Sequence, residues 1–238
     1  MTSVTHDVRA LECLTPQECG EVREALYGLR DRWETPGPAA PFYFFGAASY
    51  IDARGRDGVS YQQRVASLRP LMIERFGWVY DRVAARLAEA LGAPAVYPEA
   101  LGLPGFHLYL HSPQLASFVP AVHVDLQYRY HDWSQFGLPD LANPISFTLA
   151  IAVPGSGAAL NLFPLTLADC RGLSRDEVDA RLKSSAPTRH DYRAGVMAVH
   201  SGLQFHQIAP LGQTEPGDER ITLQGHAINS GGTWCLYW

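Results

Sequence analysis

Residues 195–210, GVMAVHSGLQFHQIAP, decide how this sequence is interpreted. The runs Val196–His200 and Gln204–Ala209 are rich in β-branched, aliphatic and aromatic residues, which favour extended backbone. Ser201 and Gly202 separate the two runs, and such a pair marks a turn. The stretch therefore predicts two β-strands joined by a short turn, and it places His206 on the second strand.

Short runs of the same kind occur on both sides of this stretch, from Gly105 to the C-terminus. Proline and glycine separate them, as in proteins built from many short antiparallel strands. The further runs are Phe106–His111, Val122–Tyr128, Ile145–Val153, Ala159–Leu165, Arg220–Ile228 and Thr233–Trp238. This spacing predicts a mainly β fold, either a sandwich or a barrel.

The first hundred residues have a helical pattern instead. Residues 15–18, TPQE, form a capping box with proline at the first helical position, and apolar residues follow at helical spacing. A second helix is predicted over about 70–91, and Phe42–Phe45 is predicted to be an aromatic strand packed on the core. Later, Ser174 and Glu177 form another capping box, which predicts one short helix within the β-rich part.

Length and composition favour a single domain. The 238 residues are 47% hydrophobic and 18% charged, which suits one sizeable core, and no linker or internal repeat divides them. We therefore expect one domain over residues 1–238. Its helical support covers about 1–100 and its β-core about 105–238.

Charge and cysteine usage limit the possible partners and compartments. The formal net charge is −5 and the pI is near 6.0, so no basic face for nucleic acid or an anionic membrane is expected. Residues 1–7 lack a basic segment followed by an apolar run, and no stretch is long and apolar enough to span a bilayer. The four cysteines lack metal-site spacing, which favours reduced thiols: Cys13, Cys19, Cys170 and Cys235. We expect a cytoplasmic protein that binds a small molecule.

A histidine and an aspartate stand two residues apart in the predicted strand Val122–Tyr128. Successive side chains of a strand point to opposite faces, so His123 and Asp125 share a face and Val124 points away. Such a pair can offer an imidazole and a carboxylate to one metal ion. An HxD pair alone has low specificity, and an ordinary His–Asp contact on a surface strand is the alternative.

A third ligand and an anion-binding group are available further along the chain. The candidate histidines are His190, His200, His206 and His226. His206 has the most specific surroundings, because it lies on the predicted strand pair and Arg220 follows in a later strand. The planar guanidinium can pair bidentately with one carboxylate of a dicarboxylic acid. The alternative for Arg220 is a surface ion pair with Asp218 or Glu219.

Taken in this order, the HxD pair, the distal histidine on a glycine-led strand pair and the sequence Arg220-Ile221-Thr222 resemble the motifs of the Fe(II)/2-oxoglutarate-dependent oxygenase superfamily. The similarity covers about Phe106 to Ile228. The first hundred residues resemble the superfamily only in its habit of bracing the β-core with N-terminal helices. The resemblance implies a double-stranded β-helix, or jelly roll.

The resemblance also implies a role for each matching residue. His123, Asp125 and His206 would be the facial triad that binds Fe(II), Arg220 would hold the C5 carboxylate of 2-oxoglutarate, and Thr222 would assist. The implied reaction consumes 2-oxoglutarate and O2, yields succinate and CO2, and oxidises a C–H bond. The halogenases of the superfamily carry a small residue in place of the acid, so Asp125 argues against halogenation. Hydroxylation is the default outcome, and desaturation, ring closure and epoxidation stay open. An amino acid or a natural-product intermediate is the expected substrate, by analogy alone.

Four further residues are candidates for the same pocket. Tyr109 could bond 2-oxoglutarate, and core packing is the alternative. Tyr128 and Arg129 follow the HxD pair and could bind the substrate, although a solvated loop is the more common state of such an arginine. His200 could line the pocket, replace His206 as a ligand, or be a core histidine.

Two rival functions remain open from the sequence. A cupin-type metalloenzyme could use the same three ligands without 2-oxoglutarate, but it would leave Arg220 without a cosubstrate to hold. A non-catalytic small-molecule binding module would use His123 and Asp125 as polar pocket groups, and it predicts no stoichiometric iron.

Overall fold

The computed structural model describes residues 8–37, 40–53, 57–116, 118–211 and 214–238. Residues 1–7, where the expected domain begins, lie outside this part. The α-helices are α1 (Pro16–Tyr27), α2 (Ser49–Asp52), α3 (Tyr61–Leu91), α4 (Pro113–Ala116) and α5 (Arg175–Ser184), and the 3₁₀ turns are η1 (Arg30–Arg32), η2 (Gln127–Tyr130), η3 (Ser134–Phe136) and η4 (Ala168–Cys170). The strands are β1 (Arg9–Glu12), β2 (Tyr43–Phe45), β3 (Ala95–Val96), β4 (Gly105–Leu110), β5 (Ile145–Ala152), β6 (Ala159–Thr166), β7 (Thr188–Asp191), β8 (Val196–Ser201), β9 (Gln204–Ile208), β10 (Glu219–Ser230) and β11 (Thr233–Tyr237).

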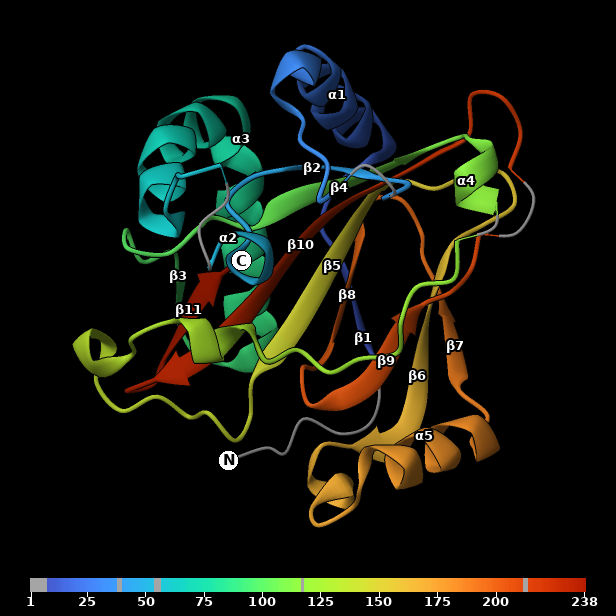
Figure 1. Ribbon diagram of the computed structural model, residues 1–238. Coiled ribbons are helices and arrows are strands. Elements are labelled where there is room, and N and C mark those ends of the chain that lie inside the picture. The colour runs from blue at the N-terminus through green and yellow to red at the C-terminus, as the bar shows by residue number, and fades with distance from the viewer. Residues whose placement is uncertain (1–7, 38–39, 54–56, 117, 212–213) are drawn as a thin grey trace.

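The described strands form two sheets. The larger sheet has the order β1-β8-β5-β10, and the long strand β10 pairs at its other edge first with β4 and then with β11. β2 adds to β4, and β3 adds to β11 as the one parallel pair. The smaller sheet has the order β7-β6-β9. Figure 1 shows the larger sheet crossing the molecule under α1 and α3, with the smaller sheet beside β8 and β1. The expectation of a mainly β protein is confirmed.

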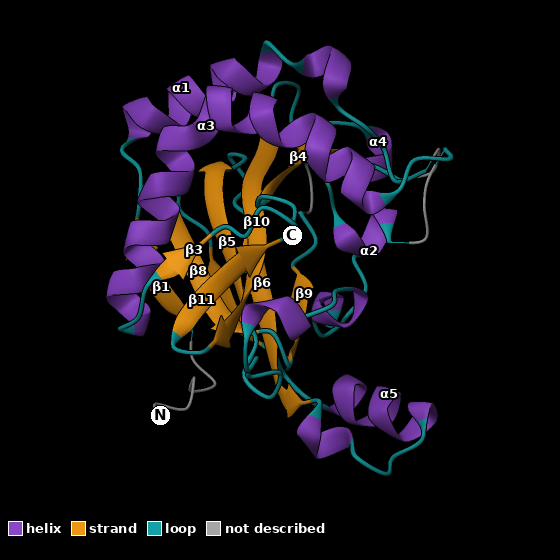
Figure 2. Cartoon of the chain, turned by 90° about the vertical axis from the view of Figure 1, so that its left-hand side faces the viewer, coloured by secondary structure: helices purple, strands orange, loops and turns teal. Residues whose placement is uncertain are grey.

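The two faces of the larger sheet differ in chemistry because side chains alternate along each strand. On β10, Ile221 and Leu223 point into the main apolar core, which they share with buried residues of α1 and α3. Arg220 and Thr222 point to the opposite face, and both are buried. Figure 2 shows α1 and α3 on one side of the larger sheet, away from β9. The polar face therefore looks toward the smaller sheet, and the candidate site lies there.

Capping boxes determine where the helices begin. The Thr15 and Ser174 boxes are both formed, so α1 and α5 begin where the sequence predicts. The prediction for α3 is wrong at its start, because the helix begins at Tyr61 and contains Pro70 in its interior. Its N-terminus is fixed by Ser60, whose hydroxyl accepts the Gln63 N–H at 3.3 Å while its own N–H donates to the Gln63 side chain at 2.8 Å. No helix in the described ranges is both long and apolar enough to cross a membrane.

The predicted strand Val122–Tyr128 is wrong. In this segment only His123 pairs with a strand residue, through an isolated bridge to His206, and Gln127 begins the 3₁₀ turn η2. The other predicted strands of the β-rich part are present, and β2 matches the aromatic run at Phe42–Phe45. The short strands β1, β3 and β7 were not predicted, because their sequences contain too few apolar residues at alternate positions to stand out.

Two glycines leave the space in which the side chain of Trp238 packs against the backbone. A Cβ atom built on Gly105 would stand 1.8 Å from Trp238 Cζ3, and one built on Gly46 would stand 2.8 Å from the same atom. The Trp238 side chain is 1% exposed and packs against Phe44 with ring centroids 6.2 Å apart. Glycine at these positions therefore allows the indole to form part of the cavity wall.

Candidate metal centre

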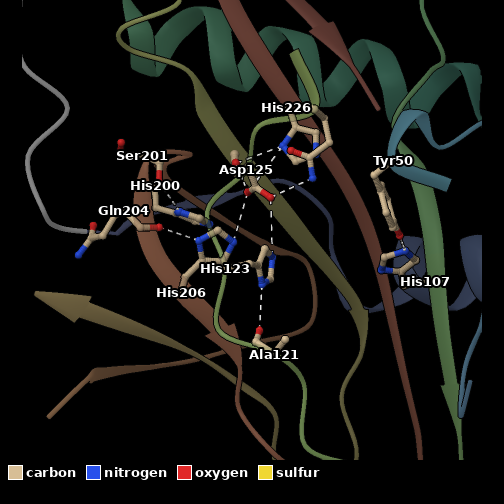
Figure 3. Close-up of polar contacts among 12 residues, drawn as sticks. Tyr50, His107, Ala121, His123, Asp125, His200, Ser201, Gln204, His206 and His226 are labelled. Carbon is tan, nitrogen blue, oxygen red and sulfur yellow. Dashed lines mark hydrogen bonds and ion pairs between the residues drawn. The ribbon is translucent and has the colours of Figure 1, made fainter. Parts of the chain in front are cut away.

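His123, Asp125 and His206 converge on one point, as Figure 3 shows. One potential ligand atom from each of them lies within 4.8 Å of the others. Asp125 Oδ2 stands 3.2 Å from His206 Nε2, and Asp125 Oδ1 stands 3.8 Å from His123 Nε2. The structure thus brings together the three residues that the sequence singled out.

Backbone hydrogen bonds position these side chains although the segment is not a regular strand. His123 and His206 exchange N–H to carbonyl bonds of 2.9 Å in both directions. The Asp125 N–H donates to the Gly202 carbonyl at 2.7 Å. These backbone hydrogen bonds hold His123 and Asp125, which stand two positions apart, so that their side chains point the same way, as they would in a strand.

The ring nitrogens of both histidines are assigned by their hydrogen bonds. His123 Nδ1 lies 3.0 Å from the Ala121 carbonyl, and His206 Nδ1 lies 2.8 Å from the Gln204 carbonyl. A carbonyl accepts only, so each Nδ1 carries a proton and Nε2 is the nitrogen left to bind a metal ion. This is the arrangement that orients a metal-binding imidazole.

The Asp125 carboxylate is buried and held by three neighbours. Ser146 Oγ donates to Oδ2 at 2.5 Å, and Gln127 Nε2 donates to Oδ1 at 3.1 Å. His226 Nδ1 stands 3.8 Å from Oδ2 and 3.1 Å from Ser146 Oγ. Burial alone raises the pKa of Asp125, but the attraction of His206 and the neighbouring histidines outweighs burial and holds the pKa well below its ordinary value. The group therefore presents a carboxylate.

This donor set fits a divalent first-row metal ion. Two neutral imidazoles and one carboxylate on one side leave the other coordination positions open, which is the facial arrangement of non-haem iron sites. Ligand bonds of about 2.1 Å at right angles separate neighbouring ligand atoms by about 3 Å. The distances of 3.2 and 3.8 Å are close to that spacing. Asp125 and His206 are buried, whereas the His123 side chain is 45% exposed and faces the open side.

A cavity of about 240 Å³ adjoins the three residues. Its walls come from both sheets, because β5, β8 and β10 supply one side and β6 and β9 the other. The lining residues are Tyr50, His107, His123, Asp125, Gln127, Ser146, Phe147, Thr148, Leu160, Tyr192, His200, His206, Ile208, Gln224, Gly225, His226 and Trp238. The group of possible metal ligands therefore borders a space large enough for a small molecule.

Arg220 is a buried cation with no anionic partner among the described residues. It is 1% exposed, and no carboxylate in the described part of the chain pairs with its three side-chain nitrogens; its polar neighbours are the neutral hydroxyls of Tyr109 and Tyr192. Its guanidinium lies 5.0 Å from the Tyr109 ring centroid and 5.3 Å from that of Tyr192, and Tyr192 lines the cavity. The alternative ion pair with Glu219 is not formed, because Glu219 bonds Arg23 and Tyr27 instead.

Tyr109 and Thr222 lie beside Arg220 but do not line the cavity, whereas His200 does line it. Tyr109 faces Arg220 across the β4–β10 pair, and Thr222 is fully buried on the same face of β10. His200 lines the cavity with its ring centroid 4.6 Å from that of His206. Among the described residues it is not in the three-residue group with Asp125, so the structure favours His206 as the third ligand.

Tyr128 and Arg129 are not brought to the cavity. Tyr128 packs in a separate cluster with Trp133 and Tyr237, and Arg129 is exposed on η2 with its guanidinium 5.8 Å from the Tyr128 ring. Neither residue lines the cavity. A substrate contact by these two residues remains a prediction from sequence that this geometry does not support.

Several lining residues were missed by the sequence analysis. Gln224 continues the alternation of Arg220 and Thr222 along β10, so the period of two could have identified it. The same alternation reaches His226, which the sequence offered only as a possible third ligand. Ser146 could have been found in the same way, on the inner face of β5. The remaining wall residues come from distant parts of the chain, namely Tyr50, Tyr192 and Trp238, and no local pattern marks them.

Comparisons with known proteins support the fold. No model of a known protein family matches the chain, and no curated protein matches its sequence. The solved structure of AviO1 from Streptomyces viridochromogenes Tue57 aligns with a TM-score of 0.52 and 14% identity, over 94% of this chain and 90% of that one. The non-heme alpha ketoglutarate dependent carbocyclase SnoK from nogalamycin biosynthesis aligns with a TM-score of 0.50 and 15% identity, over 93% of this chain and 78% of that one. The chain therefore shares its fold with AviO1 and SnoK.

Proposed function

We propose that this protein is an Fe(II)- and 2-oxoglutarate-dependent oxygenase that oxidises an unactivated C–H bond of a small molecule, with hydroxylation as the reaction. The proposal includes a double-stranded β-helix as the core, with α1 and α3 bracing it. His123, Asp125 and His206 bind the iron. The unpartnered Arg220 is the single observation that carries the proposal beyond a metal site.

A buried guanidinium without an anion is unfavourable, so it indicates a missing partner. The partner has to reach Arg220 from the cavity that also borders the three metal ligands. A molecule with a carboxylate at one end and a metal-chelating group at the other meets both requirements. 2-Oxoglutarate has these two ends, with a C5 carboxylate for Arg220 and a keto-acid pair for the metal.

Bound iron supplies the chemistry that activates O2 together with 2-oxoglutarate, which becomes succinate and CO2. The residues of this chain hold the reactants in position. Ser146 and Gln127 fix the Asp125 carboxylate through its two oxygens, and the Nδ1 protons of the histidines fix the orientation of both rings. Asp125 also occupies the position that a halide would need, which supports oxygen transfer rather than halogenation.

The shared fold with SnoK supports the class but not the reaction outcome, since SnoK is named as a non-heme alpha ketoglutarate dependent carbocyclase. A cupin-type enzyme that works without 2-oxoglutarate fits less well, because Arg220 would then stay buried and unpaired. A metal-free binding module leaves the convergence of three ligand atoms within 4.8 Å without a use.

Succinate formation tests the proposed function. Protein purified without oxygen is mixed with Fe(II), 2-oxoglutarate and ascorbate, O2 is admitted, and succinate is quantified. Wild type should produce succinate, Asp125→Ala should produce none, and Arg220→Ala should produce less but recover partly at high 2-oxoglutarate. If wild type neither forms succinate nor binds 2-oxoglutarate when it is loaded with iron, the proposal is wrong.

A further inference from the structure

The cavity wall that remains beside the metal ligands carries no charge that could pair with a charged substrate. Its lining contains one carboxylate, that of Asp125, and no lysine, arginine or glutamate among the described residues. Arg220 stands behind the wall, and the proposed function assigns it to 2-oxoglutarate. An unpaired ammonium or carboxylate group of a substrate would lose its hydration here without compensation.

An aromatic wall lies on one side of the cavity. Figure 3 shows Tyr50 and His107 on the side of Asp125 that is away from His200. Trp238 completes this wall, with ring centroids 5.3 Å from His107 and 6.3 Å from Tyr50. Tyr50 is 40% exposed and so lies at the mouth, whereas Trp238 is 1% exposed and held by Gly46 and Gly105. Such a wall suits the flat or apolar face of a ring.

Two polar atoms of the lining residues are buried without a hydrogen-bond partner in the described part of the chain. They are His107 Nδ1, which has only the Gln224 side chain as a polar neighbour, and Gln127 Oε1. Gln127 already donates through Nε2 to Asp125, so its amide oxygen can only accept. Tyr50 Oη lies 2.8 Å from His107 Nε2.

The two unpaired atoms, His107 Nδ1 and Gln127 Oε1, could be satisfied by hydrogen-bonding groups of a ligand. Burial lowers the pKa of His107 to about 3, so the ring is neutral. A phenol that donates to Nε2 leaves the ring proton on Nδ1, which is then a donor. A hydroxyl group can both donate to Gln127 Oε1 and accept from His107 Nδ1.

We propose that the substrate is an uncharged ring compound that bears hydroxyl groups, with its ring on Tyr50 and Trp238 and its hydroxyls bonded to Gln127 and His107. The proposal rests on the proposed function and narrows it, because it excludes free amino acids. The cavity of about 240 Å³ also has to hold 2-oxoglutarate. Only the uncharged, hydroxyl-bearing ring of the substrate therefore enters, and any remainder lies at the mouth against Tyr50.

A matched pair of probes tests this substrate class. Phenyl β-D-glucoside and phenyl β-D-glucuronide share a skeleton, and only the glucuronide carries a carboxylate. Their binding is measured by saturation-transfer NMR on protein loaded with 2-oxoglutarate and zinc, which is redox-inert. The glucoside should bind, and the glucuronide should bind at least about tenfold more weakly, because its buried charge lacks a partner. Failure of the glucoside to bind, or equal or tighter binding of the glucuronide, would overturn the proposal.

Variants of the mouth residue show whether the aromatic wall is the binding surface. Tyr50→Ala should weaken glucoside binding about threefold to tenfold, as expected for the loss of one ring contact, and Tyr50→Phe should retain most of it. Tyr43→Ala is the control, since Tyr43 is similarly exposed at 38% but does not line the cavity. If Tyr50→Ala and Tyr43→Ala behave alike, the wall is not the site. Zinc and 2-oxoglutarate binding are quantified in the same samples. Loss of these two would count against the proposed function, whereas loss of glucoside binding alone would count against the substrate class.

Discussion

Replacement of Arg220 by methionine separates the binding role of this residue from its structural role. Methionine keeps a long apolar side chain but removes the guanidinium. The variant loses two contacts with the faces of Tyr109 and Tyr192, each worth up to about 2 kcal/mol for a desolvated cation. The substitution also removes the unfavourable free energy of burying an unpaired cation, which is several kcal/mol. The two effects nearly cancel, so the free energy of unfolding without ligand should change little.

The effect on 2-oxoglutarate binding should be large instead. A bidentate pair between Arg220 and the C5 carboxylate contains two charge-assisted hydrogen bonds, each worth about 1.5–3 kcal/mol. Their loss weakens binding by about 3–6 kcal/mol, which corresponds to a factor of roughly 10² to 10⁴ in Kd. At a 2-oxoglutarate concentration of 100 times the wild-type Kd, the ligand stabilises wild type by about 2.7 kcal/mol and Arg220→Met by less than about 0.4 kcal/mol.

Urea unfolding of the zinc-loaded protein, with and without 2-oxoglutarate, measures both quantities. Arg193→Met is the control, because Arg193 is 67% exposed and pairs with Glu12 on the surface. It should respond to 2-oxoglutarate as wild type does. Stabilisation of Arg220→Met by 2-oxoglutarate to the same extent as wild type would refute the assignment of Arg220 to the cosubstrate.

Two further substitutions have defined outcomes. Ser146→Ala removes the 2.5 Å bond to the acidic ligand and should weaken Co(II) binding about 10- to 100-fold in a spectroscopic titration, whereas Ser230→Ala, which removes a buried bond to a backbone carbonyl, should not; equal affinities would exclude the positioning role. Gly105→Ala places a Cβ 1.8 Å from Trp238 and should lower the free energy of unfolding by about 1–3 kcal/mol in urea, whereas Gly20→Ala, in an open helical position, should raise it by about 0.5–1 kcal/mol. Unchanged stability of Gly105→Ala would show that the indole is not held as described.

The β-rich part of the fold and most of the metal centre could be predicted from the sequence, because both depend on the alternation of side chains along the chain. The period of two along β5, β8 and β10 marks their buried faces, and the capping boxes mark two helix starts. The start of α3 could not be recognised in the same way. The predicted helix began at about Pro70, but the Ser60 box ten residues earlier begins the helix, and tertiary packing tolerates the proline.

The segment that carries His123 and Asp125 shows why a correct site can follow from a wrong element. Alternation predicted that the two side chains share a direction, and they do, but through three backbone hydrogen bonds, two at His123 and one at Asp125, rather than through a regular strand. The far side of the cavity could not be predicted. Tyr50 on α2, His107 on β4 and Trp238 after β11 meet only in the folded protein, and no spacing in the sequence indicates their contact.

A crystal structure of the protein, grown without oxygen in the presence of Fe(II) and 2-oxoglutarate, would show directly whether these residues bind iron and the cosubstrate together. We expect one iron ion bound by His123 Nε2, Asp125 and His206 Nε2. We also expect a single 2-oxoglutarate that chelates this iron through its keto-acid end and pairs its C5 carboxylate with Arg220. An iron ion held by other residues, or a 2-oxoglutarate whose distal carboxylate does not reach Arg220, would contradict this expectation.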